Sequence, residues 1–485
     1  MPTLTEVLPF RIIGNVYFVG TNEASCHLID TGDGLILIDT GYEESAPLIE
    51  RSMNTLGFSL SDVKLILHSH GHYDHTYATP LLLEKAKNAK TYLGREDVRY
   101  LNGKFVPDAY YEDGGVITLG NTSITTLFTP GHTEGAYSFF FDVLEDGVRY
   151  RAGMFGGAGP RQLLLDYMKR ADRNVCFLNR GKFFTSIDRL LNERVDVPLG
   201  NHTWHNRTLQ KAQQAREGAT KNPFICEGEW EKFLLSSKET LWQLMLEDTR
   251  THFVNFAHRG APAYCPENTL LSFYTGLYMG ANGIETDVRR SKDGTLILFH
   301  DDTLTRVCGV EGRPEDLTLE EFISLKVEGY GLWDHPITFE DFLRHFADKD
   351  LTFAIEIKGE GCEEDVADMI FKYGLQTKCT VTSFRFDFIK KIKEYAPLIR
   401  IGYLTSKLDD ETINQLIAIQ ADEYCPRGRT LTREWVDKLH RIGFNVRAWG
   451  VENEEMMKYL YDIGVDGMTV NFPDKLTEYI QNKVK

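Results

Sequence analysis

The chain has 485 residues, of which 42% are hydrophobic and 26% charged, so two or three folded domains are expected and disorder is not. Its formal net charge of −17 argues against nucleic-acid binding, because that needs clustered lysine and arginine to displace counterions from phosphates. An acidic surface is also not attracted to anionic membranes.

The cysteines and the hydropathy pattern bear on the cellular compartment. Eight cysteines, Cys176 among them, are scattered without a C-x-x-C pair, which is typical of reduced thiols in a cytosolic protein. The first residues lack a basic segment followed by a long apolar run, and no later stretch approaches ~18 uninterrupted apolar residues. We therefore expect a cytoplasmic protein without stable membrane insertion.

The first half of the chain mixes predicted strands and helices. Short apolar runs separated by turn residues predict strands at residues 16–19, 34–38 and 63–67. Between Trp230 and Met245 the apolar residues follow helical spacing. We expect this helix to be the last element of a first domain, residues 1–248.

From residue 253 the pattern changes to strands that alternate with amphipathic segments. The predicted strands are residues 253–257, 283–288, 352–357, 379–383, 399–404, 423–426, 445–450 and 467–470. Eight strands in such an alternation predict a (β/α)8 barrel. The second domain is therefore expected over residues 249–485.

A histidine-rich motif follows the predicted strand at residues 63–67. Residues 68–75 read H-S-H-G-H-Y-D-H and contain H-x-H-x-D-H, and imidazoles grouped with a carboxylate are ligands that zinc prefers. His132 in T-P-G-H-T and His202 in G-N-H each lie in a predicted turn after a predicted strand. Either alone is more typical of a surface or capping histidine, but with the first motif they indicate a metal centre.

These motifs and the Asp39-Thr40-Gly41 turn, in this order, resemble the metallo-β-lactamase superfamily over about residues 15–248. The resemblance implies an αβ/βα sandwich that binds two zinc ions and hydrolyses a substrate that the sequence does not identify. It assigns one zinc ion to His70, His72 and His132, and the other to Asp74, His75 and His202. Asp74 is also the candidate catalytic residue of this domain.

One stretch departs from the superfamily pattern. Many members carry a bridging aspartate after a later strand, whereas residues 151–157 here read R-A-G-M-F-G-G. The ligand set that remains is similar to that of the third subclass of metallo-β-lactamases, which uses the late histidine instead. Lactamases of that subclass usually carry export signals, and no such signal is recognised here.

A second set of polar residues lies at the ends of the predicted barrel strands. Residues two apart on a strand face the same side, so Glu285 and Asp287 converge, and Glu356 with Lys358 repeats the arrangement on the next strand. Three carboxylates at strand ends predict a site for one Mg²⁺ or Ca²⁺ ion. This end of a barrel is the one that carries active sites.

The order of H-R-G (258–260), P-E-N-T (266–269), E-T-D (285–287), S-K-D-G (291–294), H-D (300–301) and E-I-K (356–358) resembles the glycerophosphodiester phosphodiesterase family over about residues 254–473. The resemblance implies hydrolysis of a small-molecule glycerophosphodiester to an alcohol and glycerol 3-phosphate. It implies His258 and His300 as general acid and base, since histidines titrate near neutral pH. Arg259 and Lys358 are expected to hold the phosphate, and Trp449 is a candidate for the pocket wall.

Other interpretations stay open. The first domain could retain zinc as a regulatory or binding module without turnover, or could hydrolyse a β-lactam or a lactone. The barrel could act on lysophospholipids as well as on their deacylated head groups.

Overall fold

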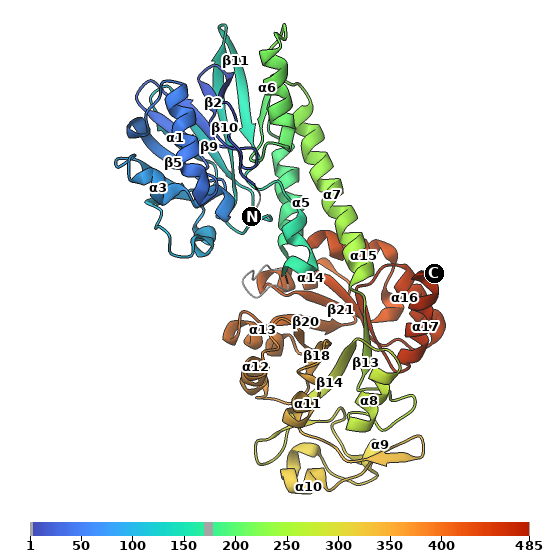
Figure 1. The fold of residues 1–485 in the computed structure, drawn as a ribbon. Coiled ribbons are helices and arrows are strands. Elements are labelled where there is room, and N and C mark those ends of the chain that lie inside the picture. The colour runs from blue at the N-terminus through green and yellow to red at the C-terminus, as the bar shows by residue number, and fades with distance from the viewer. Residues whose placement is uncertain (1–2, 169–177, 485) are drawn as a thin grey trace. The chain divides into compact units, whose positions relative to one another are not determined.

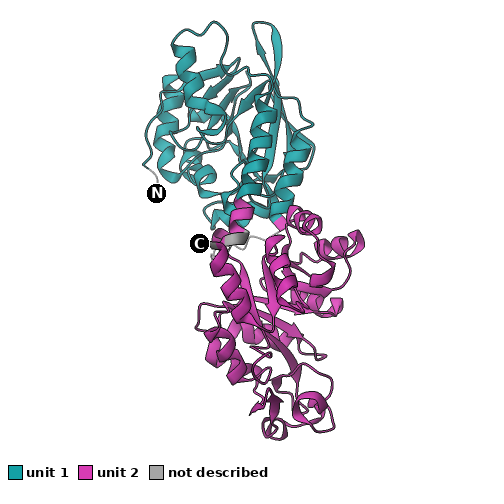
Figure 2. Cartoon of the chain, turned by 90° about the vertical axis from the view of Figure 1, so that its right-hand side faces the viewer, with its two compact units in different colours: residues 1–163, 179–243 teal, residues 164–178, 244–485 magenta. Residues whose placement is uncertain are grey.

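A computed structural model describes residues 3–168 and 178–484. The chain divides into two compact units, residues 1–163 with 179–243 and residues 164–178 with 244–485 (Figure 2). The division falls inside helix α7 (Glu229–Thr251). The boundary expected between residues 248 and 249 lies within the same helix.

Unit 1 contains two sheets (Figure 1). The seven-stranded sheet runs in chain order through β1 (Phe10–Ile13), β2 (Val16–Phe18), β3 (His27–Asp30), β4 (Leu35–Ile38), β5 (Val63–Leu67), β6 (Lys90–Leu93) and β7 (Ala109–Tyr110). The five-stranded sheet has the order β12 (Val197–Leu199), β11 (Val148–Met154), β10 (Tyr137–Glu145), β9 (Thr122–Phe128) and β8 (Gly115–Leu119).

The sheets share one apolar core and carry helices on their outer faces. Strand β10 shows why, because side chains on a strand alternate between the faces: Phe139 and Phe141 lie in a core with Ile38 and Leu67 of the other sheet. Phe140 points the other way and meets Trp230 of α7. A second core packs the seven-stranded sheet against α1 (Ala46–Thr55) and α3 (Thr79–Leu83). The predicted αβ/βα sandwich is confirmed.

Unit 2 contains a closed barrel of eight parallel strands. Its strands are β13 (Val254–His258), β14 (Gly283–Arg290), β18 (Thr352–Ile357), β19 (Cys379–Ser383), β20 (Arg400–Thr405), β21 (Glu423–Pro426), β22 (Asn445–Ala448) and β23 (Gly467–Val470). Strand β13 pairs with both β14 and β23, which closes the barrel, and β15 (Leu296–Leu298) adds an antiparallel strand beside β14. The predicted (β/α)8 barrel is confirmed.

A helix follows each barrel strand: α8 (Leu270–Tyr278), α11 (Phe339–Phe346), α12 (Glu363–Lys372), α13 (Phe386–Tyr395), α14 (Asp410–Ala418), α15 (Arg433–Ile442), α16 (Glu454–Asp462) and, after the last strand, α17 (Pro473–Val484). Several begin at a side chain that accepts a backbone N–H of the first turn, a preferred N-terminal cap. Thr269, Thr338, Asp409, Thr432 and Asn453 cap α8, α11, α14, α15 and α16 in this way.

A small insertion, called here the β15–α11 excursion, separates β15 from α11. It contains α9 (Thr305–Cys308), α10 (Leu319–Ile323) and the hairpin of β16 (Val327–Gly329) with β17 (Leu332–Asp334). Phe299, Val307 and Phe322 belong to an apolar cluster of its own. This cluster fixes α9 beside the end of β15.

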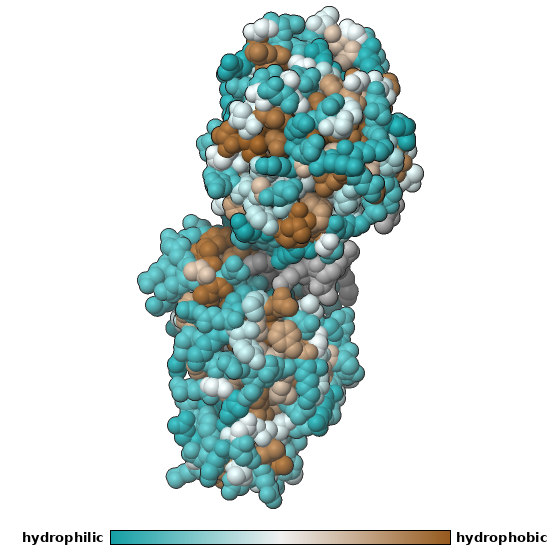
Figure 3. Space-filling model, turned by 90° about the vertical axis from the view of Figure 1, so that its left-hand side faces the viewer, coloured by the Kyte–Doolittle hydropathy of each residue, from teal (hydrophilic) through white to brown (hydrophobic). Residues whose placement is uncertain are grey.

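The structure also bears on the expected free cysteines and on the expected lack of membrane insertion. Among the described residues the cysteines are free, while Cys176 lies outside them. No helix in the described part of the chain has the length and apolar character needed to cross a membrane. On the face drawn in Figure 3, hydrophobic residues form small patches among hydrophilic ones.

Candidate active sites

The histidine motif lies between β5 and the short helix α2 (Tyr73–Thr76). It is held by Asp39, which follows the neighbouring parallel strand β4 and is fully buried with a φ of 58°. The Asp39 carboxylate accepts hydrogen bonds from the Ser69 backbone N–H (2.7 Å), the Ser69 hydroxyl (2.7 Å) and Nδ1 of His75 (2.8 Å). His75 therefore presents Nε2 to the interior of the motif.

The predicted zinc ligands lie in two groups, each with its ligand atoms within 4.8 Å of one another. In the first group, of His70, His72 and His132, Nδ1 of His72 lies 3.0 Å from Nε2 of His132. In the second group, Nε2 of His75 lies 3.3 Å from Nε2 of His202 and 3.5 Å from Oδ2 of Asp74. The structure thus brings together six residues that span positions 70 to 202.

These groups fit a divalent cation. Nε2 of His70 is buried and has no hydrogen-bond partner in the described part of the chain, an arrangement that costs free energy unless the lone pair is used. Burial, and then the neighbouring imidazoles, hold the pKa of His70 well below its usual value, and the same causes lower the pKa of His202. Neutral imidazoles with converging lone pairs are zinc ligands.

The stretch without a bridging aspartate packs closely against the first group. A Cβ atom on Gly157 would lie 2.7 Å from Cβ of His132, and one on Gly156 would lie 1.7 Å from the carbonyl oxygen of Tyr137. Neither position accepts a side chain without rearrangement. The group of Asp74, His75 and His202 therefore forms without a carboxylate from this strand end.

Two neighbours of the histidine groups were not singled out from the sequence as contacts. Asp39 was used only as part of a recognisable turn, yet it orients His75. Trp204, more than half exposed, stacks on the His202 ring with centroids 4.3 Å apart and an interplanar angle of 13°. Its position two residues after His202 was the only available signal.

The three predicted carboxylates of the barrel, Glu285, Asp287 and Glu356, are buried and offer oxygens within 4.8 Å of one another. Asp287 on β14 stands in register with Glu356 on β18. Burial, and then neighbouring carboxylates, raise the pKa of Glu285 well above its usual value and that of Glu356 to about 7. Burial acts in the same direction on Asp287, but Arg259 holds its pKa below the usual value. Such an oxygen set fits Mg²⁺ or Ca²⁺.

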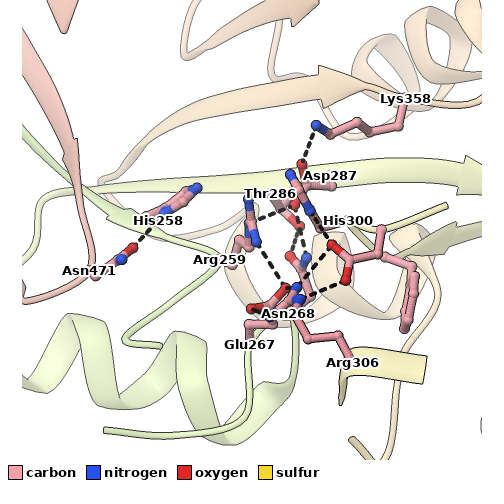
Figure 4. A network of polar contacts seen from close by, with 12 residues as sticks. His258, Arg259, Glu267, Asn268, Thr286, Asp287, His300, Arg306, Lys358 and Asn471 are labelled. Carbon is pink, nitrogen blue, oxygen red and sulfur yellow. Dashed lines mark hydrogen bonds and ion pairs between the residues drawn. The ribbon is translucent and has the colours of Figure 1, made fainter. Parts of the chain in front are cut away.

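Both predicted barrel histidines use Nδ1 within the protein (Figure 4). His258, at the end of β13, donates from Nδ1 to Oδ1 of Asn471 (2.5 Å), and its Nε2 lies 3.9 Å from Glu285. His300, after β15, donates from Nδ1 to the Asp301 carboxylate (2.6 Å). Burial lowers the pKa of both, that of His258 to about 3, which favours the neutral rings. With Nδ1 donating, the lone pair of a neutral ring is on Nε2.

One pocket of about 240 Å³ brings these groups together. Its charged and polar wall includes His258, Arg259, Glu285, His300, Glu356 and Lys358, and its apolar wall includes Phe384, Leu404, Trp449 and Val451. The Arg259 Nε lies 3.2 Å from Asp287, and the Lys358 Nζ lies 2.9 Å from Glu356. Sequence reasoning missed Phe384, Asn471 and Arg447, which also line the pocket.

Each half of the chain matches the model of a known protein family. The model of the "Glycerophosphoryl diester phosphodiesterase family" matches residues 258–475, and that of the "Metallo-beta-lactamase superfamily" matches residues 19–146. Both resemblances are confirmed, the second over a shorter range than the expected 15–248. With the barrel and the sandwich, they define a two-domain hydrolase in which a phosphoric diester hydrolase is fused to a metallo-hydrolase.

Two proteins named glycerophosphodiester phosphodiesterase are similar to this chain. One, from Caldanaerobacter subterraneus, is 31% identical over 235 residues, which are 46% of this chain and 96% of that protein. The other, from Bacillus altitudinis, is 31% identical over 232 residues, 45% of this chain and 95% of that protein. The chain belongs to the glycerophosphoryl diester phosphodiesterase family and carries a metallo-β-lactamase superfamily domain ahead of the barrel.

Solved structures that are similar to this chain include BJP-1, a subclass B3 metallo-β-lactamase of Bradyrhizobium japonicum, with 26% sequence identity and a TM-score of 0.47. The match covers 51% of this chain and 97% of that one. The metallo-β-lactamase FEZ-1 from Legionella gormanii has 29% sequence identity and a TM-score of 0.46, and the match covers 51% of this chain and 99% of that one.

Proposed function

We propose that the barrel hydrolyses glycerophosphodiesters to an alcohol and glycerol 3-phosphate. The observation that supports this most is a pocket whose wall combines the two imidazoles of His258 and His300 with Glu285 and Glu356, two of the three clustered carboxylates. The names of the related proteins support the same substrate class.

His258 and His300 divide the proton transfers in this proposal. Hydrolysis requires one group that takes a proton from the attacking water and one that gives a proton to the departing alkoxide. Because each ring donates from Nδ1 to a protein oxygen, Nε2 is the atom that exchanges the proton. Arg259 and Lys358 bind the phosphate oxygens, and Trp449 forms part of the wall beside the alcohol. A divalent ion held by Glu285, Asp287 and Glu356 supplies further positive charge to the phosphoryl group when it is bound.

The test is release of glycerol phosphate by the intact chain from a panel of glycerophosphodiesters with Mg²⁺ or Ca²⁺. Replacing His258 or His300 with alanine is expected to lower kcat by about 10²- to 10⁴-fold, the usual contribution of a general acid or base. His345→Ala is the control, because His345 is an exposed barrel histidine that contacts Tyr274. Wild-type rates in His258→Ala would contradict the proposal.

The apolar wall of the pocket makes lysophospholipids a second candidate substrate class. The same panel therefore includes a lysophospholipid beside the deacylated diester with the same head group. A larger kcat/KM for the lysophospholipid would assign the apolar wall to an acyl chain.

For the N-terminal domain we propose a binuclear zinc hydrolase. His70, His72 and His132 would hold one ion, and Asp74, His75 and His202 the other. Bound zinc makes water a nucleophile near neutral pH, so the domain requires no nucleophilic side chain. The alternatives are hydrolysis of a β-lactam or a lactone, and a regulatory or binding role in which the domain retains zinc without turnover. Substrate screening followed by Asp74→Asn separates hydrolysis from binding, because only a hydrolase has an activity for this variant to abolish.

Metal analysis of the intact protein tests the ligand assignment independently of activity. We expect two zinc ions per chain, with one lost on His70→Ala and one lost on Asp74→Asn. Retention of both ions in the two variants would reject the assignment.

A further inference from the structure

Arg306, on the short helix α9, clamps two carboxylates beside the barrel pocket. Its Nε and Nη2 donate to the two oxygens of Asp301 at 2.6 and 3.0 Å. Its Nη1 and Nη2 donate to the two oxygens of Glu267 at 2.9 and 2.6 Å. Bidentate pairs of this kind fix geometry as well as supplying energy.

The clamp connects to two residues of the pocket wall, His300 and Arg259 (Figure 4). Asp301 accepts the Nδ1 hydrogen of His300 at 2.6 Å. Glu267 accepts from Nη1 of Arg259 at 2.9 Å, and Nε of Arg259 lies 3.2 Å from the carboxylate of Asp287. Behind His300, alternating charges therefore run from Asp301 through Arg306 to Asp287, a carboxylate of the predicted metal site.

Arg306 itself is outside the pocket. It is absent from the residues that line the pocket, and half of its side chain is exposed. Arg306 therefore contacts the pocket only through the residues it holds. Glu267, His300 and Asp301 offer ligand atoms that a metal ion could use, but here the guanidinium already contacts both carboxylates.

The clamp matters because an imidazole has two tautomers. The Nδ1–H of His300 is favoured only while Asp301 stands in line with it, and the other nitrogen is then available for proton transfer. Asp301 lies in a partly exposed turn after β15, where an unclamped carboxylate could rotate away and bond to water. Arg306 occupies both Asp301 oxygens and removes that freedom.

We propose that Arg306 is a positioning residue for the barrel reaction: through Asp301 it fixes the tautomer and orientation of His300, and through Glu267 it fixes Arg259. The effect on rate rests on the proposed function of the barrel, whereas the effect on the tautomer does not.

The test uses the intact chain labelled with ¹⁵N-histidine, with the His300 resonances assigned by their loss in His300→Gln. In the wild-type protein the His300 shifts should report Nδ1–H. Arg306→Gln should convert a substantial part of the population to Nε2–H. It should lower kcat by roughly 10- to 100-fold, as loss of such outer partners does, with a smaller rise in KM through the loosened Arg259. Arg306→Lys keeps the charge but loses the bidentate contacts, so it should resemble Arg306→Gln. Added guanidinium should partly restore kcat in Arg306→Ala.

Arg290→Gln is the matched control. Arg290, at the end of β14, pairs with Asp365 at 2.5 Å and does not line the pocket, so both readouts should stay as in the wild type. An unchanged tautomer and unchanged kcat in folded Arg306→Gln would overturn the proposal. A tautomer change without diester hydrolysis in any form of the protein would instead reject the proposed function and leave the positioning role standing.

Discussion

Several histidines in the two units share one arrangement at the residue scale: Nδ1 is bound to a protein oxygen and Nε2 faces the site. Asp39 accepts from His75, Asn471 from His258 and Asp301 from His300. An oxygen behind an imidazole sets its tautomer and increases its basicity. The same hydrogen-bonding arrangement thus orients a predicted zinc ligand in unit 1 and the predicted proton-transfer residues in unit 2.

The first residue-scale prediction concerns Asp39. An asparagine at this position keeps one acceptor oxygen, whereas the carboxylate accepts three hydrogen bonds from Ser69 and His75. Asp39→Asn should weaken zinc binding by about 10- to 100-fold, measured by competition with a coloured chelator. Asp33→Asn, on an exposed turn after β3, is the control and should bind as the wild type does. Equal affinity in the two variants would show that Asp39 does not support the ligands.

The residues that the sequence predicted share a local rule. Glu285 and Asp287 are two apart on a strand, which puts both on one face, and the histidine motif is compact in sequence. No local rule exists for Asn471, which meets His258 across 213 residues, or for Arg306, whose short helix is set by the packing of the β15–α11 excursion. These partners could be recognised only once the chain was folded.

At the element scale, the turn from β13 to α8 positions the phosphate-binding candidate. Arg259 and Gly260 have left-handed φ values of 51° and 95°. Left-handed backbone at a residue other than glycine costs about 1–2 kcal/mol, and Asn268, itself at a φ of 55°, secures the turn by donating to Asp287 at 2.9 Å.

Gly260→Ala tests this turn. A Cβ there would lie 2.4 Å from the backbone carbon of Ser272, so the turn must move and carry Arg259 with it. We expect a loss of roughly 2–4 kcal/mol in the free energy of unfolding, as for other strained or overpacked substitutions, together with a raised KM for the diester. Gly294→Ala is the control, since its φ of 92° imposes the backbone strain while nothing lies within 4 Å of the added Cβ. Denaturant melts of equal midpoint for the two variants would contradict the steric argument.

The sequence predicted the barrel strands better than the rest of the fold. Strands β18, β19, β21 and β23 have the predicted bounds, because each is a buried run between turn residues. The hairpin of β16 and β17 was not predicted: its strands are three residues long and largely exposed, so they show no apolar run. Helix α7 continues to Thr251, beyond the predicted end of its apolar pattern.

At the scale of the whole molecule, the buried carboxylates couple metal binding to stability. Burial, and then Asp287, raise the pKa of Glu356 to about 7 in the metal-free protein, whereas an unfolded glutamate titrates near ~4.3. Between these values the folded state holds a proton that the unfolded state has released. Stability from this group is therefore full below about pH 4 and is lost as the pH rises towards 7.

The measurement is thermal unfolding in excess chelator, with Glu356→Gln as reference, because the effects of all other titrating groups on stability cancel in the comparison. Relative to the variant, the wild type should lose on the order of 2–3 kcal/mol between pH 5 and pH 8, at ~1.4 kcal/mol per pKa unit. Added Mg²⁺ or Ca²⁺ should restore more stability at pH 8 than at pH 5. A difference that does not vary with pH would mean that Glu356 is ionised throughout.

The central claim is that the chain carries two separate hydrolytic sites, and one measurement tests it most directly. Glycerol phosphate release is followed in the intact chain, in His258→Ala and in His70→Ala, with Mg²⁺ or Ca²⁺ supplied. The account predicts that only His258→Ala loses activity, because His70 belongs to the metal group of the other unit. Equal loss in His70→Ala would contradict the independence of the sites, and no release by the intact chain from any diester would contradict the assignment of the barrel.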